Sequence, residues 1–253
     1  YYVAESYYRM KDLSRALPIY EALSQDKNFN MGSRVAGRLG EIQFKQGNYA
    51  SAITNFHRLE LLATNKTEQY NAWMGLMESF FLLSQYDSAD AFARIILERG
   101  GVDAGGQNKA SLFLGKSAFA RGDYATAQDE FLNTLNTAQD EYGAEAKYLL
   151  AQTFYLNKEY KKSYETLLSL TEDFAAYDEW VGKSYLLMAD NFVAMDQLFQ
   201  ARATLQSLVD NFPMQTIKDA AATKLKEIDR AEAEKKRRLE ADTLDTDTIQ
   251  TNR

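Results

Sequence analysis

A small residue recurs every 36 to 38 positions through most of this chain of 253 residues. The members of this series, which we call the contact row, are Ala16, Ala52, Ala89, Ala127, Ser163 and Ala201. Twelve positions before each member lies a second residue, mostly small as well: Ala4, Gly40, Met77, Gly115, Ala151 and Ala189. Two helices pack closely where both carry a small residue, so each period predicts a pair of antiparallel helices. A period near 37 residues with two helices is typical of an α-solenoid.

The residues around the contact row repeat in the same register. Four positions after each member, one helical turn along the same face, the chain carries Tyr20, Phe56, Ala93, Phe131, Leu167 and Leu205. Three positions before four of the members, a tyrosine ends a short polar turn, in Asn48-Tyr49, Gln85-Tyr86, Asp123-Tyr124 and Glu159-Tyr160. We expect this tyrosine to plug the turn between the two helices of a period.

The composition favours an all-α protein and excludes several classes of function. The chain has two prolines and is 45% hydrophobic and 26% charged, so it can bury a large core. Its formal net charge is -7, which argues against nucleic acid as the main ligand because phosphate contacts need clustered Lys and Arg. It has no cysteine, hence no disulfide and no thiolate metal site. No apolar run is long enough to predict direct membrane insertion.

The two ends of the chain depart from the repeating pattern. Six periods occupy residues 1–213, and the first lacks its opening residues because the chain starts at Tyr1 in the middle of the pattern. We therefore expect a fragment of a longer protein. Residues 214–240 predict a capping helix that becomes purely charged, and the Asp- and Thr-rich residues 241–253 predict a disordered tail.

Two local features predict breaks in the helical pattern. Pro18 lies past the first turn of its helix and lacks the N–H that would bond to Ser14, which predicts a kink or local fraying. Four glycines in residues 100–106 predict either a mobile loop at one edge or a hinge between two halves of three repeats each.

The pattern resembles the tetratricopeptide repeat, a helix-turn-helix unit of about 34 residues. Trp73 falls on the tryptophan position of that motif, Leu76 on its leucine and Phe80 on its first-helix aromatic, while Pro213 matches its closing proline. The repeats here are longer, and Ser163 replaces an alanine. The resemblance covers all six periods and implies an α-solenoid in the form of a right-handed superhelix.

The resemblance also implies a groove that binds a protein segment along the concave face. In the family, the residue eight positions before the contact row faces this groove, and we call the series the aromatic row: Tyr8, Phe44, Phe81, Phe119, Tyr155 and Val193. Five aromatic rings can bury an apolar partner, although the same rings can also serve the core.

A second series, which we call the acidic row, lies three positions before the aromatic row. It consists of Glu5, Glu41, Glu78, Lys116, Gln152 and Asp190. Some members of the family grip acidic tails with Lys, Asn and Arg at this level and one turn earlier. Here the earlier turn carries none of these residue types, so that carboxylate clamp is absent. An apolar, neutral-to-basic protein or peptide is therefore the expected ligand.

No catalytic residue, cofactor site or metal site is predicted. Gly115-Lys116-Ser117 and Gly182-Lys183-Ser184 lack the earlier glycine and the strand of a phosphate-binding loop. His57 is the only histidine and has no companions for metal binding or catalysis. The basic run at residues 235–238 lies among glutamates, which favours a solvated helix end over contact with phosphate or a membrane surface.

The expected function is that of a non-enzymatic interaction scaffold. The Asn-Phe-Pro ending before residue 214 resembles bacterial envelope repeat proteins that help to assemble outer-membrane or periplasmic complexes, so such a location is favoured over the cytoplasm. An alternative is a structural spacer or self-association arm of a larger protein, with an empty groove. A regulatory domain fused to an upstream enzyme is a third hypothesis.

Overall fold

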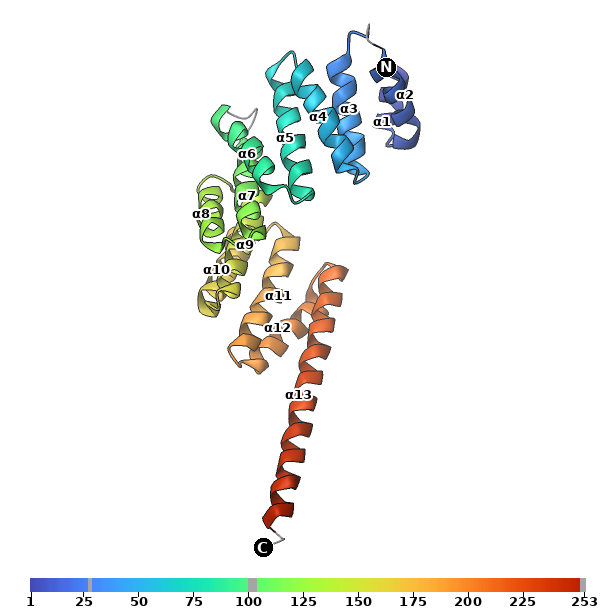
Figure 1. Ribbon diagram of the computed structural model, residues 1–253. Coiled ribbons are helices and arrows are strands. Elements are labelled where there is room, and N and C mark those ends of the chain that lie inside the picture. Colours follow the sequence, from blue (N-terminus) through green and yellow to red (C-terminus); the bar gives the residue numbers. More distant parts are fainter. Residues whose placement is uncertain (27–28, 100–103, 251–253) are drawn as a thin grey trace. The chain divides into compact units, whose positions relative to one another are not determined.

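The computed structural model describes residues 1–26, 29–99 and 104–250, and every regular element in these ranges is an α-helix. The helices shown in Figure 1 are α1 (Tyr2–Arg9), α2 (Leu13–Gln25), α3 (Gly32–Lys45), α4 (Tyr49–Leu62), α5 (Lys66–Leu82), α6 (Tyr86–Arg99), α7 (Ala104–Ala120), α8 (Tyr124–Leu135), α9 (Glu141–Leu156), α10 (Tyr160–Asp173), α11 (Asp178–Ala194), α12 (Leu198–Asn211) and α13 (Gln215–Gln250). The all-α repeat fold expected from the sequence is confirmed. None of these helices is long and apolar enough to cross a lipid bilayer.

The chain divides into two compact units, which we describe separately. Unit 1 comprises Tyr1–Ala146, and unit 2 begins at Lys147, within α9. Inside unit 1 each helix packs on the next one along the chain, from α1 to α8 (Figure 1). Inside unit 2 the last helix, α13, packs on both α11 and α12. Within each unit, a helix pair therefore stacks on the pair that follows it in sequence, as in a solenoid.

The small residues of the contact row lie at the centres of the helix pairs. All six have no exposed surface: Ala16, Ala52, Ala89, Ala127, Ser163 and Ala201. The residues twelve positions earlier are buried as well, at Ala4, Gly40, Met77, Gly115, Ala151 and Ala189. The close helix–helix contacts predicted from the two series are confirmed.

The turn between the two helices of a repeat has the same backbone conformation in all six repeats. The residue five positions before the contact row has a φ between 58° and 78°, at Lys11, Gly47, Ser84, Gly122, Lys158 and Asp196. The N–H of this residue donates to the carbonyl of the aromatic-row residue at 2.9–3.0 Å. The following N–H donates to the carbonyl five positions before it at 2.8–3.0 Å. These two bonds form a Schellman motif, which ends the first helix with its carbonyls satisfied.

Three segments carry the features for which the sequence predicted a break or disorder. Helix α2 runs without interruption through Pro18, because Ala16 and Tyr20 on the same helix are buried in the core that α2 shares with α1 and α3. Glycines 105 and 106 belong to the first turn of α7, and residues 100–103 lie outside the described ranges. Helix α13 continues to Gln250, and the disorder expected for residues 241–253 stays a prediction. Extending an existing helix by one residue costs far less than nucleating a new one.

Candidate partner-binding groove

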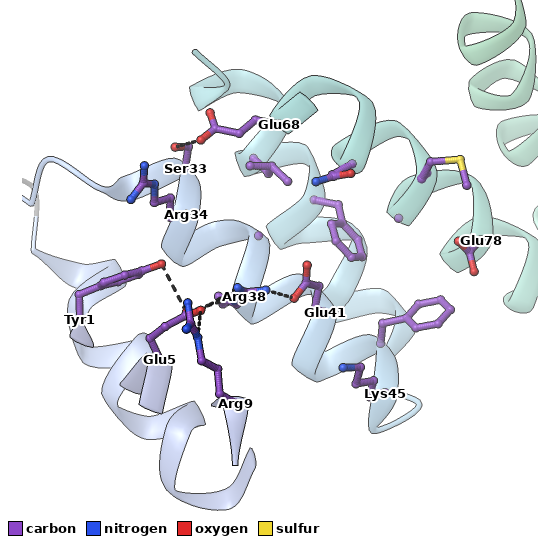
Figure 2. Close-up of a pocket in the computed structure, with 17 residues that line it drawn as sticks. Tyr1, Glu5, Arg9, Ser33, Arg34, Arg38, Glu41, Lys45, Glu68 and Glu78 are labelled. Carbon is purple, nitrogen blue, oxygen red and sulfur yellow. Dashed lines mark hydrogen bonds and ion pairs between the residues drawn. The ribbon is translucent and has the colours of Figure 1, made fainter. Parts of the chain in front are cut away.

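The first helices of the first three repeats line a pocket of about 570 Å³ in unit 1, which we call the first pocket. Its apolar lining comes from Phe44 of α3, Phe56 and Leu59 of α4, and Met74 of α5. Polar and charged residues also line it, and those labelled in Figure 2 are Tyr1, Glu5, Arg9, Ser33, Arg34, Arg38, Glu41, Lys45, Glu68 and Glu78. A cavity of this size with an apolar lining and a few polar groups has the usual character of a binding site.

The ring of Phe56 reaches the first pocket because two helical glycines leave room for it. A Cβ atom at Gly40 of α3 would lie 2.7 Å from the Phe56 ring, and one at Gly75 of α5 would lie 2.5 Å from it. The sequence identified Gly40 as a contact position but gave no signal at Gly75, because the equivalent positions of the other repeats carry larger residues.

A partly buried charge cluster forms the wall of the first pocket between α1 and α3. Arg38 donates to both carboxylate oxygens of Glu5, at 2.8 and 3.0 Å, and to Glu41 at 2.8 Å (Figure 2). Tyr20 also donates to Glu5 at 2.8 Å. The hydrogen bonds from Arg38 lower the pKa of Glu5 to about 2, against the opposing effect of burial. Glu5 is therefore ionised and fully engaged with its own protein near neutral pH.

Most of the acidic row pairs with a residue of the following repeat. Glu78 of α5 pairs with Lys109 of α7 at 2.7 Å. In the next repeat the charges are exchanged, since Lys116 of α7 pairs with Glu145 of α9 at 2.7 Å. In unit 2, Asp190 of α11 pairs with Lys224 of α13 at 2.6 Å. Gln152 has no hydrogen bond of its side chain among the described residues.

The acidic row suggested a preference for basic ligands. Its pairing within the protein removes the basis of that preference. The carboxylates of Glu5, Glu41 and Glu78 already hold cations of the protein itself. Two other polar residues line the first pocket and were not predicted from the sequence. In the described part of the chain their side chains have no hydrogen-bond or ion-pair partner. They are Arg34 of α3 and Asn71 of α5, and both are exposed. Each lies 18 positions before a contact-row residue, so a further row taken at this position of every repeat could have located them.

The aromatic row serves the packing of each turn as well as the surface. All five rings are half-buried, and four of them contact the tyrosine that ends the turn of their own repeat. These pairs are Phe44–Tyr49, Phe81–Tyr86, Phe119–Tyr124 and Tyr155–Tyr160, with ring centroids 5.4–5.5 Å apart. The fifth ring, Tyr8, lies under the guanidinium of Arg38 at 4.3 Å. The turn plug predicted from the tyrosines is thus present.

The structure brings together only part of the predicted site residues. Phe44, Glu41 and Glu78 line the first pocket. Phe81 packs against Phe113 at 5.0 Å, and Phe119 packs against Phe131 at 6.5 Å, so both rings contribute to the packing of unit 1. Tyr155, Gln152 and Asp190 belong to unit 2 and are not part of the first pocket.

The motifs that we rejected as catalytic or phosphate-binding lie in ordinary helical positions. The two Gly-Lys-Ser triplets are parts of α7 and α11. His57 of α4 contacts Glu60 and meets the stacked rings of Phe80 and Phe92 edge-on. The described residues contain no group of three or more His, Cys, Asp or Glu side chains that could hold a metal ion.

Comparisons with known proteins agree with the repeat architecture. Two tetratricopeptide repeat family models match the sequence, over residues 112–181 and 183–213. No curated protein matches it. Similar solved structures include a tetratricopeptide repeat protein from Parabacteroides merdae, with 16% identity, a TM-score of 0.69, and coverage of 92% of this chain and 86% of that one.

Two further structures extend the comparison. One is the C-terminal part of a TPR repeat-containing protein from Cytophaga hutchinsonii, with 16% identity, a TM-score of 0.64, and coverage of 82% of this chain and 77% of that one. The other is YrrB, described as a TPR protein with an unusual peptide-binding site, with 11% identity, a TM-score of 0.50, and coverage of 80% and 96%. Identities this low indicate a common fold and nothing finer. The two family matches, together with the repeats of the sequence, identify the chain as a tetratricopeptide repeat protein.

Proposed function

We propose that this chain is a non-enzymatic scaffold that holds a segment of a partner protein in the groove lined by the first helices of its first three repeats. The observation that carries the proposal is the first pocket, which combines an apolar lining with polar groups that have no partner within the described part of the protein. Protein binding is the general role of tetratricopeptide repeats, and YrrB, which shares the fold, is described as having a peptide-binding site.

The chemistry of the pocket defines the segment it suits. Phe44, Phe56, Leu59 and Met74 favour an apolar side chain, since burial of apolar surface supplies most of the affinity at such sites. Exposed Arg34 and Asn71 offer donors to the carbonyl or carboxylate groups of the same segment. We therefore propose an apolar segment with a neutral or acidic flank, in place of the neutral-to-basic ligand expected from the acidic row. A role in assembling an envelope complex depends on the sequence resemblance alone.

The test is selection of peptides on the full chain, followed by affinity measurement with single variants. Asn71→Arg places a longer side chain in the first pocket, where its bulk takes space from the apolar side chain of the ligand, and we expect it to weaken binding of the selected peptides at least tenfold. Asn133→Arg is the matched control, because Asn133 is also an exposed helical asparagine of unit 1 and lies outside the pocket. Circular dichroism checks that both variants fold.

Two outcomes would overturn the proposal. If no peptide is selected, or if Asn71→Arg and Asn133→Arg bind the selected peptides alike, the first pocket is not the site. If the chain instead sediments as a concentration-dependent oligomer that neither variant alters, the alternative of a self-association arm takes its place.

A further inference from the structure

Unit 2 contains a smaller pocket of about 280 Å³ between α11, α12 and α13, which we call the second pocket. Its apolar lining residues are Ala189, Val193, Leu198, Leu205, Ile228 and Ala231. Its charged lining residues are Asp190, Lys224, Glu227 and Glu232. All of these belong to unit 2, so the second pocket is independent of the first.

Helix α13 takes the place that the first helix of a further repeat would have. Asp190 pairs with Lys224, 34 positions later, in the way that Glu78 pairs with Lys109, 31 positions later. The second pocket therefore lies between α11 and α13 as the first lies between α3 and α5. In both pockets the second helix of the repeat contributes the residue four positions after the contact row, Phe56 in one and Leu205 in the other.

In four other repeats the aromatic-row ring stacks on the turn tyrosine, and the sixth repeat has neither of these two rings. Val193 occupies its position in the aromatic row, and Leu198 occupies the position of the turn tyrosine. Both residues line the second pocket, and Val193 is 41% exposed. In the first pocket, by contrast, the turn tyrosine Tyr49 is covered by Phe44 and is not among the described lining residues. Two aliphatic side chains in place of two rings thus leave an apolar hollow that reaches down to the turn.

The charge around the second pocket is also incomplete. Asp190 is neutralised by Lys224, and Glu232 is paired with Arg202. Glu227 is exposed and has no ion pair with any side chain that the structure describes. The pocket therefore combines space for an aromatic ring with one negative charge that no described side chain of unit 2 neutralises.

We propose that the second pocket docks a segment of a partner protein that carries an aromatic side chain next to a basic residue. The ring fills the space of the absent ring pair, where it can bury about 150–250 Å² of surface. The basic side chain pairs with Glu227, so that charge complementarity sets the preference. This inference deepens the proposed scaffold function by assigning a second ligand class to a different unit.

The test uses the methyl resonances of Val193, Leu198 and Ile228 in the full chain, with acetyl-Phe-Arg-amide as the probe. We expect chemical-shift changes that saturate with a dissociation constant on the order of 0.1–1 mM, because a ligand of this size buries little surface. Acetyl-Phe-Glu-amide and acetyl-Ala-Arg-amide should each bind at least fivefold more weakly. Equal shifts with all three probes, no shifts, or shifts confined to unit 1 would overturn the proposal.

Variants test the two halves of the recognition separately. Val193→Phe restores the ring found in other repeats and should abolish the shifts, and Ala231→Leu should do the same from the α13 side if the first variant folds poorly. Glu227→Gln should reduce the preference for Arg over Glu in the probe at least threefold, whereas Glu172→Gln, an exposed glutamate of α10, should leave it unchanged. If Glu227→Gln has no effect on the preference, the charge argument is wrong.

Two controls separate this proposal from its alternatives. Asn71→Arg should leave binding of the dipeptide unchanged, so failure of the first pocket and failure of the second are distinguishable. A second copy of the chain is the competing occupant, because Phe199 of α12 is 81% exposed. Two observations together would overturn docking of a partner. The first is a dimer that Phe199→Ser abolishes, and the second is a change of the chemical shifts of the pocket methyl groups on dilution without probe.

Discussion

The amide of Asn191 donates a hydrogen bond of 2.9 Å to the hydroxyl oxygen of Ser163, and neither residue has any exposed surface. Ser163 is the one member of the contact row that is not alanine. Its hydroxyl joins α10 to α11 and accepts a hydrogen bond from one of the two N–H groups of the Asn191 amide, while the amide also donates to the carbonyl of Leu187 at 2.9 Å. The departure from the small apolar consensus therefore has a local cause.

Replacing Ser163 by Ala should destabilise unit 2 by about 1–3 kcal/mol, because one N–H of Asn191 is then buried without an acceptor. The matched control is Ser117→Ala in α7, where the buried hydroxyl has no partner in the described structure, so its removal should be neutral or stabilising. Urea denaturation of both variants measures the difference. Equal destabilisation by the two changes would contradict this account.

Gly75→Ala should destabilise unit 1 by about 1–3 kcal/mol, because the new methyl group would overlap the ring of Phe56 at 2.5 Å. Gly37→Ala, also in a helix that lines the first pocket, should be neutral or stabilising by up to about 1 kcal/mol. Its methyl group would lie at an ordinary 3.5 Å from Leu59, and alanine favours the helix. Thermal denaturation compares them, and a lower Tm for Gly37→Ala than for Gly75→Ala would refute the packing argument.

Lys158→Gly should stabilise the chain by about 0.5–1 kcal/mol. Lys158 has a φ of 63° at the turn of its repeat, a conformation that is strained for residues with a Cβ atom and free for glycine. The converse change, Gly122→Ala at a φ of 77°, should destabilise by about 1 kcal/mol, since no neighbouring atom lies within 4 Å and only the backbone is affected. Denaturant midpoints give both values. Stabilisation by both substitutions would be inconsistent with a backbone cause.

The ion pair of Glu5 predicts an acid-sensitive contribution to stability. Hydrogen bonds from Arg38 lower the folded pKa of Glu5 to about 2 from its usual value of 4.5, so the contribution is complete above about pH 4.5. It is lost as the pH falls from 4.5 through 2, and it amounts to on the order of 3 kcal/mol. The difference in unfolding free energy between the native chain and Glu5→Gln should therefore shrink between pH 5 and pH 2.5. A difference that stays constant over this range would show that Arg38 does not hold the carboxylate.

The candidate site was predictable only in part. The sequence located Phe44, Glu41 and Glu78, because they belong to rows that recur once per repeat. It missed Gly75, which has no counterpart in other repeats, and it misread the acidic row as free charge. Each ion pair between this row and the following repeat joins residues that lie 29 to 34 positions apart in the sequence. The stacking of successive repeats brings their charged atoms within 3 Å, so the sequence of one repeat does not show whether its carboxylate is free.

What the sequence determined by itself is the architecture. The spacing of small and large residues within one repeat is a local property of two packed helices, and it identifies the buried contacts, the turns and the all-α fold without knowledge of how the repeats stack. The tertiary structure alone decided which charges are paired, why Ser163 carries a hydroxyl, and where pockets open. These depend on the space between one repeat and the next, where a single exchange such as Val193 for an aromatic residue changes the surface without disturbing the period.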